Sequence, residues 1–463
     1  MSITEGVPYG LFDCFMQREG IFPVRSAPRD VEWFDRSRLG MFVHWNHSSV
    51  AAREISWCMH PDWQPMPPVE YEALARRFNP TSFNADEWVA LAREVGMGYL
   101  LMVVKHHDGF AMWDTQTSDY KITRTPFGRD VCAEIADACH KAGMRLGWYY
   151  SPADWWHPAS RAARWDEYVP CMQTHLRELL TRYGTVDMLA FDFWSPAVLH
   201  PSWDGFYREL RRLCPRLIFS RNTPWADGDY EVFEHSVPYV RRPGSTESTG
   251  IEASNGYVSR MTCSAPFEVL RTLQCQGWSY RDGSARPLAD VVRLLVDAAG
   301  SGGNLTLNVT PDASGRIPSA QVERLGELGA WMRMYGETVN GTVNGPLPPL
   351  LKLKSDPTKG ATETPAMLGG AGRRPHGATA SVTTTCVGRR VYVHVLDWMG
   401  AAELALPGLA GHVVTCRLVG GVAVRIAAAA VPRADPDTVI ALELDIMATD
   451  LSIAEPPQLA RRP

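Results

Sequence analysis

The 463-residue sequence has no apolar run approaching about 18 residues, so we expect no membrane-spanning helix. Its first residues lack the basic start and apolar core of a secretory signal. The ten cysteines are scattered, without CxxC pairs, which favours reduced thiols. A net charge of -5 gives no reason to expect a nucleic acid or an anionic membrane as partner. These absences favour a cytoplasmic protein, with a processed secreted form as the alternative.

Buried strands alternate with amphipathic helices along the first 340 residues. Helical periodicity is clear in two stretches, Ala85–Val95 and Val131–Ala142, and Gly143 stands where a helix C-cap would. Strands are expected at Leu39–Val43, 98–104, Arg145–Tyr149, Val186–Phe191, Leu217–Phe219, Tyr230–Phe233 and Asn304–Val309. Repeated units of this length predict an α/β fold, a (β/α)8-like TIM barrel over residues 1–340.

The composition changes after about residue 335, where glycine, threonine, valine and proline become more frequent. Short segments such as Val391–Val395 and Val413–Arg417 alternate as strands do. The stretch Lys354–Pro375 has the composition of a loop. We therefore expect a C-terminal β-sandwich domain over residues 341–463.

The run Lys105–Phe110, Lys-His-His-Asp-Gly-Phe, follows an apolar strand and is hard to explain by packing alone. Ligands are held at that end of a barrel strand. His44 also follows a strand, so a zinc site must be weighed. If the strand continues, His106 and His107 point to opposite sides, and no HxH or HExxH spacing occurs. We expect these imidazoles to bind hydroxyl groups, with no metal and no cofactor.

Two carboxylates follow apolar strands and fit a glycosidase. Asp192 directly follows the apolar segment Leu189–Phe191, and Glu234 directly follows the expected strand Tyr230–Phe233. Retaining glycosidases need two carboxyl groups about 5–5.5 Å apart, one as nucleophile and one as acid/base. The simpler interpretation is a capping aspartate and a surface glutamate. Glu231 and Glu252 compete with Glu234 for the acid/base role.

Five motifs in chain order resemble the α-L-fucosidases of glycoside hydrolase family 29. They are Arg38–Trp45, Lys105–Phe110, Gly147–Ser151, Gly277–Tyr280 and Gly302–Pro311. The resemblance implies a barrel, a trailing β-sandwich and a retaining mechanism. It implies that Asp192 is the nucleophile and Glu234 the acid/base. It also implies the following sugar-binding residues: His44, Trp57, His106, His107, Tyr149, Arg221 and Trp278.

Two positions depart from the family pattern. Many members have Glu-Trp where this chain has Ser56-Trp57, and Glu54 is a candidate to replace the missing carboxylate. Ala190 stands where tryptophan is frequent, two residues before the nucleophile.

The resemblance predicts an exo-enzyme that releases terminal α-L-fucose from fucosylated oligosaccharides or glycoconjugates. Two alternatives stay open. One is hydrolysis of a related sugar such as an α-L-galactoside, for which Ala190 would make room, and the other is a catalytically silent sugar-binding protein. The sequence indicates neither linkage preference nor oligomeric state.

Overall fold

The computed structural model describes most of the chain. The described residues are 28–60, 66–192, 195, 197, 200–220, 228–234, 237, 266–347, 349–352, 379–398, 403–406, 408–409, 411–419, 437–451, 453 and 457–460. Two residues singled out from the sequence, Arg221 and Glu252, lie outside them, as does the expected loop Lys354–Pro375.

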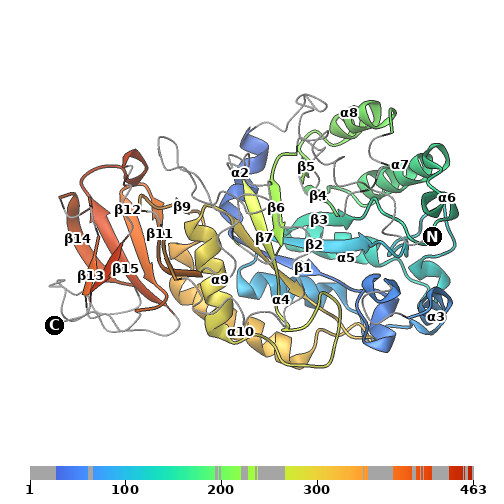
Figure 1. The fold of residues 1–463 in the computed structure, drawn as a ribbon, viewed down its shortest axis with the longest axis horizontal. Coiled ribbons are helices and arrows are strands. Elements are labelled where there is room, and N and C mark those ends of the chain that lie inside the picture. Colours follow the sequence, from blue (N-terminus) through green and yellow to red (C-terminus); the bar gives the residue numbers. More distant parts are fainter. Residues whose placement is uncertain are drawn as a thin grey trace, which may run out of the picture.

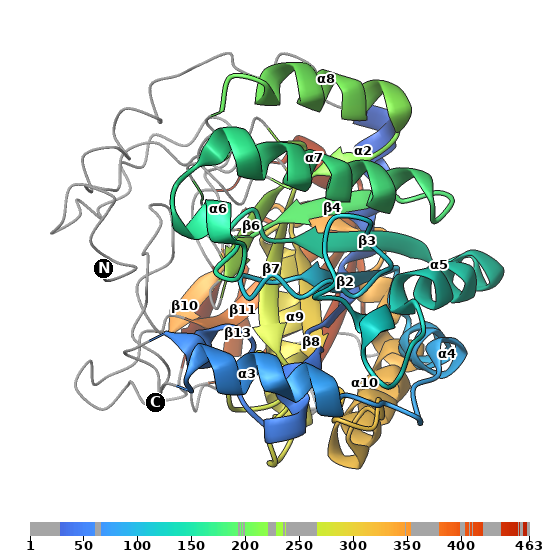
Figure 2. The ribbon, with the colours of Figure 1, turned by 90° about the vertical axis from the view of Figure 1, so that its right-hand side faces the viewer.

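Eight parallel strands form the first sheet, in the order β5-β4-β3-β2-β1-β8-β7-β6. The sheet curls, with helices on its outside (Figures 1 and 2), which confirms the predicted (β/α)8-like barrel. The strands are β1 Leu39–Val43, β2 Tyr99–Lys105, β3 Arg145–Tyr150, β4 Met188–Phe191, β5 Ile218–Phe219, β6 Glu231–Glu234, β7 Phe267–Thr272 and β8 Asn304–Val309.

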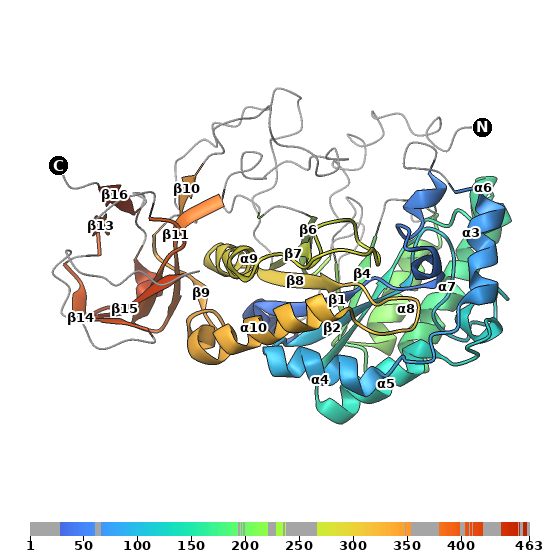
Figure 3. The ribbon, with the colours of Figure 1, turned by 90° about the horizontal axis from the view of Figure 1, so that it is seen from below.

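Most of the helices surround the strands on the outside, but the helix over residues 28–37 packs Val31 and Phe34 into the inner cluster of the barrel. The helices are α2 Pro28–Ser37, α3 Pro68–Leu74, α4 Ala85–Val95, α5 Val131–Ala142, α6 Pro158–Arg161, α7 Trp165–Thr181, α8 Trp203–Leu213, α9 Leu288–Gly300 and α10 Ser319–Tyr335. In Figure 3, α4, α5 and α10 lie along one side of the barrel. The two helices predicted by periodicity have the expected bounds because both ends are capped. The Asp130 carboxylate caps the N-terminus of α5, and Gly143 ends it in the left-handed region with φ of 65°.

The core has an inner and an outer layer because side chains alternate along each strand. On β1, Phe42 points into the barrel, where it joins Tyr149 and Leu101. Its neighbours Met41 and Val43 pack outward against the helices.

The barrel is closed weakly between β5 and β6. Among the described residues, one isolated bridge joins Ser220 to Tyr230, just beyond β5 and just before β6. Beside it, the backbone N–H of Asp229 donates to Phe219 O (2.8 Å). The guanidinium of Arg211, from α8, pairs with the Asp229 carboxylate (2.6 Å), and both side chains are buried. We call this junction the β5–β6 seam.

The C-terminal part is antiparallel. A six-stranded sheet contains β9 Val343–Asn344, β10 Leu350–Lys352, β11 Thr379–Val387, β12 Arg390–Val395, β14 Val413–Leu418 and β15 Thr438–Leu444. A separate ladder pairs β13 Glu403–Ala405 with β16 Gln458–Ala460. Leu404 of β13 packs against the apolar cluster of the larger sheet, and β11 contacts α9 of the barrel (Figure 1).

The predicted boundary between residues 340 and 341 stays a prediction. Among the described helices, none is long and apolar enough to cross a membrane.

Candidate active site

The predicted site residues gather at the carboxyl ends of the barrel strands. His44 follows β1, the two histidines follow β2, and Asp192 follows β4. Tyr149 is near the end of β3, and Glu234 is the last residue of β6. Because parallel strands end at one edge, these side chains, far apart in sequence, face one region.

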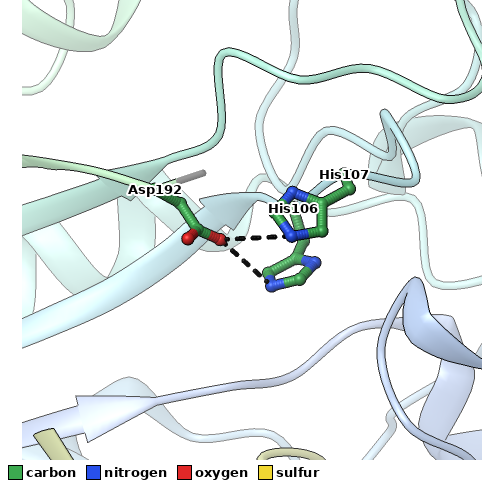
Figure 4. A group of neighbouring side chains, drawn as sticks. All are labelled: His106, His107 and Asp192. Carbon is green, nitrogen blue, oxygen red and sulfur yellow. Dashed lines mark ion pairs between the residues drawn. The ribbon is translucent and has the colours of Figure 1, made fainter. Parts of the chain in front are cut away.

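The Lys105–Phe110 run turns at its second residue. Strand β2 stops at Lys105, and a turn follows in which Gly109 N–H donates to His106 O (3.1 Å). Both imidazoles therefore face the same carboxylate (Figure 4). His106 Nε2 lies 3.4 Å and His107 Nε2 3.5 Å from Asp192 Oδ2. The condition under which the two rings would point to opposite sides is not met, because β2 ends at Lys105.

Serine hydroxyls orient both rings. The Nδ1 atom of His106 lies 2.7 Å from Ser56 Oγ, and that of His107 lies 2.8 Å from Ser151 Oγ. Burial lowers the pKa of both imidazoles well below the usual value, so both are neutral at physiological pH. Neutral rings held in this way can each donate or accept one hydrogen bond in the site.

Lys105 and Asp108 act as supports for the turn. Lys105 Nζ is fully buried and donates to the carbonyls of Ser151 (2.8 Å) and Ala153 (3.0 Å). Asp108 accepts hydrogen bonds from Tyr71 Oη (2.6 Å) and from Asn46 Nδ2 (2.8 Å). The two charged residues of the motif thus hold loops in place, and its imidazoles face Asp192.

A hydrogen-bond chain joins His44 to the loop that carries Trp278. Asn308 Nδ2 donates to Trp278 O (2.8 Å), so its Oδ1 is the atom that faces His44 Nδ1 at 2.7 Å. His44 must therefore carry its proton on Nδ1, which leaves the Nε2 lone pair as an acceptor. Burial lowers the pKa of His44 to about 4. Its ring lies 5.2 Å from that of Trp278, at 34°.

Glu54 holds the same loop from the other side. Its Oε1 accepts from the backbone N–H groups of Trp278 (2.9 Å) and Ser279 (3.0 Å). The guanidinium of Arg281 lies 3.8 Å from Oε2, and burial raises the pKa of Glu54 to about 7. Glu54, the candidate to replace the carboxylate that is missing at position 56, is thus engaged in positioning Trp278.

The pKa of the Tyr149 phenol is affected by both candidate carboxylates. Burial, the negative charges of Asp192 and Glu234, and a hydrogen bond with Asp192 all raise its pKa well above the usual value. The charge of Glu268 acts in the same direction, so the phenol of Tyr149 lies in a negatively charged part of the barrel. Glu231 begins β6 and lies at the opposite end of that strand from Glu234.

Aromatic rings form one wall beside the histidines. Trp57 and Trp155 meet edge to face at 5.4 Å, and His107 lies 4.9 Å from Trp155. Sequence reasoning did not single out Trp155, nor the hydroxyl of Ser151 as a partner of His107. Their only signal was adjacency to the end of β3, at Tyr150.

A sequence model of the family described as Alpha-L-fucosidase matches residues 24–337. This chain belongs to that family. The matched range contains every predicted site residue, from His44 to Trp278, and ends before the antiparallel sheets.

Curated relatives of this fucosidase-family chain include the plasma alpha-L-fucosidases of Rattus norvegicus and Homo sapiens. The rat protein is 26% identical over 347 residues, which cover 67% of this chain and 70% of the relative. The human protein is 25% identical over 337 residues, covering 67% and 69%.

Solved structures agree with this membership. Alpha-L-fucosidase isoenzyme 1 from Paenibacillus thiaminolyticus is 29% identical with a TM-score of 0.70, covering 90% of this chain and 99% of that one. The Thermotoga maritima alpha-fucosidase, solved with a mechanism-based inhibitor, is 22% identical with a TM-score of 0.66 over 89% and 96% of the two chains, and shares the fold.

Proposed function

We propose that this chain is a retaining exo-α-L-fucosidase that releases terminal α-L-fucose from fucosylated oligosaccharides or glycoconjugates. One arrangement carries the proposal. Asp192 lies at a barrel strand end with Tyr149 and two histidines around it, and Glu234 ends β6 at the same edge of the parallel sheet. A binding protein would need no second carboxylate there.

In the first step, an oxygen of Asp192 attacks the anomeric carbon of the fucosyl unit. Glu234, protonated, donates its proton to the departing glycosidic oxygen, and a glycosyl ester forms on Asp192. In the second step, Glu234 removes a proton from water, which attacks the same carbon and frees Asp192. This requires the two carboxyl groups to approach to about 5–5.5 Å.

The surrounding side chains would bind the sugar. His44 offers an acceptor at Nε2, and His106 and His107 offer ring nitrogens beside the nucleophile. The rings of Trp57 and Trp278 would pack against the apolar face and the methyl group of fucose. Arg221, which the family resemblance places beside the nucleophile, lies outside the described residues.

Covalent trapping tests the nucleophile directly. Incubation with 2-deoxy-2-fluoro-fucosyl fluoride should add one fluorofucosyl group, seen by intact mass, and peptide mapping should place it on Asp192. The Asp192→Ala variant should remain unlabelled and inactive. A labelled Asp192→Ala protein, or near-normal turnover by that variant, would show the assignment to be wrong.

The acid/base needs its own experiment with a matched control. Glu234→Ala should lower the rate by about 10²–10⁴ on a substrate with a poor leaving group. Sodium azide should restore turnover of an activated aryl fucoside and give a fucosyl azide. The control Glu231→Gln, on the same strand, should keep the wild-type rate. Azide rescue of an inactive Glu231 variant instead would move the role to that residue.

The sugar itself is best assigned as fucose. Ala190 is fully buried in the inner barrel cluster that includes Tyr149 and Met188, so the small side chain leaves no accessible space for the extra hydroxyl of galactose. The aryl α-L-fucoside should therefore have a higher kcat/KM than the aryl α-L-galactoside. A higher kcat/KM for the aryl α-L-galactoside would favour the alternative, an enzyme that hydrolyses α-L-galactosides.

We also propose a cytoplasmic location. All eight cysteines among the described residues are free thiols, the state expected in a reducing compartment. Fractionation with thiol-alkylation mass spectrometry would test this, and disulfides in the native protein would contradict it.

A further inference from the structure

We propose that the cluster formed by His106, His107 and Asp192 is also a binding site for a zinc ion, which acts as a reversible inhibitor competing with the sugar. The ligand atoms of the three residues all lie within 4.8 Å of one another. Elsewhere in the described part of the chain, no other three histidine, cysteine or acidic side chains come together in this way. The inhibition, though not the binding, rests on the role proposed for Asp192.

The distances fit a metal better than a direct hydrogen bond. Good N–H···O hydrogen bonds are about 2.7–3.2 Å long, whereas the two Nε2 atoms lie 3.4 Å and 3.5 Å from Asp192 Oδ2. Zinc binds imidazole nitrogen and carboxylate oxygen at roughly 2.0–2.1 Å, so neighbouring ligands in a tetrahedral site are about 3.3–3.4 Å apart. Both observed separations are close to that edge length, and both involve the same carboxylate oxygen (Figure 4).

The outer atoms of the cluster are also arranged as in metal sites. Histidines that bind a metal through one ring nitrogen donate the other N–H to a fixed acceptor, which sets the tautomer and ring orientation. Ser56 Oγ and Ser151 Oγ occupy those positions at the two Nδ1 atoms. Both imidazoles are buried, and an imidazole ligates a metal in its neutral form.

Two neutral nitrogens and one carboxylate would leave the fourth zinc position for water or a substrate hydroxyl. A zinc ion there would bind the nucleophilic oxygen and occupy the ring nitrogens proposed to bind sugar hydroxyls. Sugar and metal should therefore exclude each other. Magnesium prefers oxygen ligands and octahedral geometry, so it should not replace zinc.

Direct binding provides the test, because loss of activity in these variants would be uninformative. The whole chain, stripped with EDTA, is titrated with zinc chloride by calorimetry and with cobalt(II) by its visible absorption. We expect one zinc per chain, and a tetrahedral cobalt spectrum. Added L-fucose should weaken the apparent zinc affinity. Inhibition should raise KM with kcat unchanged and be reversed by EDTA.

Variants separate this cluster from surface sites. Asp192→Asn and His107→Gln should each lower zinc affinity at least about tenfold, since even an outer-shell change typically costs that much. Ser56→Ala, which removes the Nδ1 partner of His106 and the acceptor of the Asp108 N–H group, should also weaken binding. His412→Ala, at the exposed His412–Asp445 pair (3.0 Å), should leave it unchanged.

Three results would overturn the proposal. They are no saturable zinc binding to the wild type, unchanged zinc affinity in Asp192→Asn, or loss of binding in His412→Ala instead. If zinc binds as expected but fluorofucosyl trapping fails, the zinc site stands and the catalytic assignment falls.

Discussion

Replacement of Glu268 by glutamine would test the effect of a buried carboxyl group inside the barrel. This side chain of β7 is fully buried, and its Oε2 accepts hydrogen bonds from Tyr99 Oη (3.0 Å) and from the Thr306 hydroxyl. Among the described residues, its Oε1 has no hydrogen-bond partner. Burial raises the pKa of Glu268 from 4.5 to about 7.

The sign of the effect follows from this shift. The folded state binds the Glu268 proton more tightly than the unfolded state, so its stabilisation is complete below pH 4.5 and is lost as pH rises through about 7. Each pKa unit corresponds to about 1.4 kcal/mol, so the contribution amounts to about 3 kcal/mol across this window. Glutamine stays neutral and keeps an acceptor oxygen for the two hydroxyls.

The assay is urea unfolding of the wild type and Glu268→Gln at about pH 5 and about pH 8. Between these values, the free energy of unfolding should fall by about 3 kcal/mol more in the wild type than in the variant. Glu54 titrates in both proteins and cancels in the comparison. Glu323→Gln, an exposed change on α10, is the control and should behave as the wild type. Equal pH dependence in the wild type and Glu268→Gln would refute the reasoning.

Two further changes probe the supports of the site. Gly277→Ala would force a side chain into a position with φ of 65° and against the Glu54 carboxylate. It should lower the free energy of unfolding by roughly 1–3 kcal/mol. It should also raise KM by a larger factor than it lowers kcat, and an unchanged KM would contradict a role of the Trp278 loop in sugar binding. Asn308→Asp would put a carboxylate beside His44 Nδ1 and raise the pKa of His44 from about 4. The acid limb of the kcat/KM profile should shift upward, and an unmoved limb would show that protonation of His44 does not limit sugar binding.

Much of the barrel could be predicted from the sequence because its strands are continuous apolar runs and its helices carry caps. Strand β7 was missed. Its sequence, Phe-Glu-Val-Leu-Arg-Thr, places Glu268 and Arg271 within a fully buried strand. A pattern based on hydrophobicity cannot anticipate that a carboxyl group is tolerated there through hydrogen bonds to Tyr99 and Thr306.

The candidate site was also predictable only in part. Polar residues at strand ends pointed to His44 and Asp192 because barrel topology brings those ends together. The partners that orient them, such as Asn308 and Ser151, depend on three-dimensional contacts between distant segments and left no local signal. The direction of His106 and His107 depends on where β2 ends, and the sequence did not indicate that the strand stops directly before the pair.

The β5–β6 seam has a consequence for how the two carboxylates are held apart. Asp192 follows β4 and Glu234 ends β6, so the shorter path between them around the barrel crosses the seam. The other path runs through five intervening strands joined by full ladders. Among the described residues, the gap proposed to hold the sugar is thus spanned by the part of the sheet with the shortest strand pairing. Hydrogen exchange at Asp229 and Tyr230, whose backbone N–H groups both donate to Phe219 O, would measure how often this junction opens, and the buried Arg211–Asp229 ion pair holds it closed.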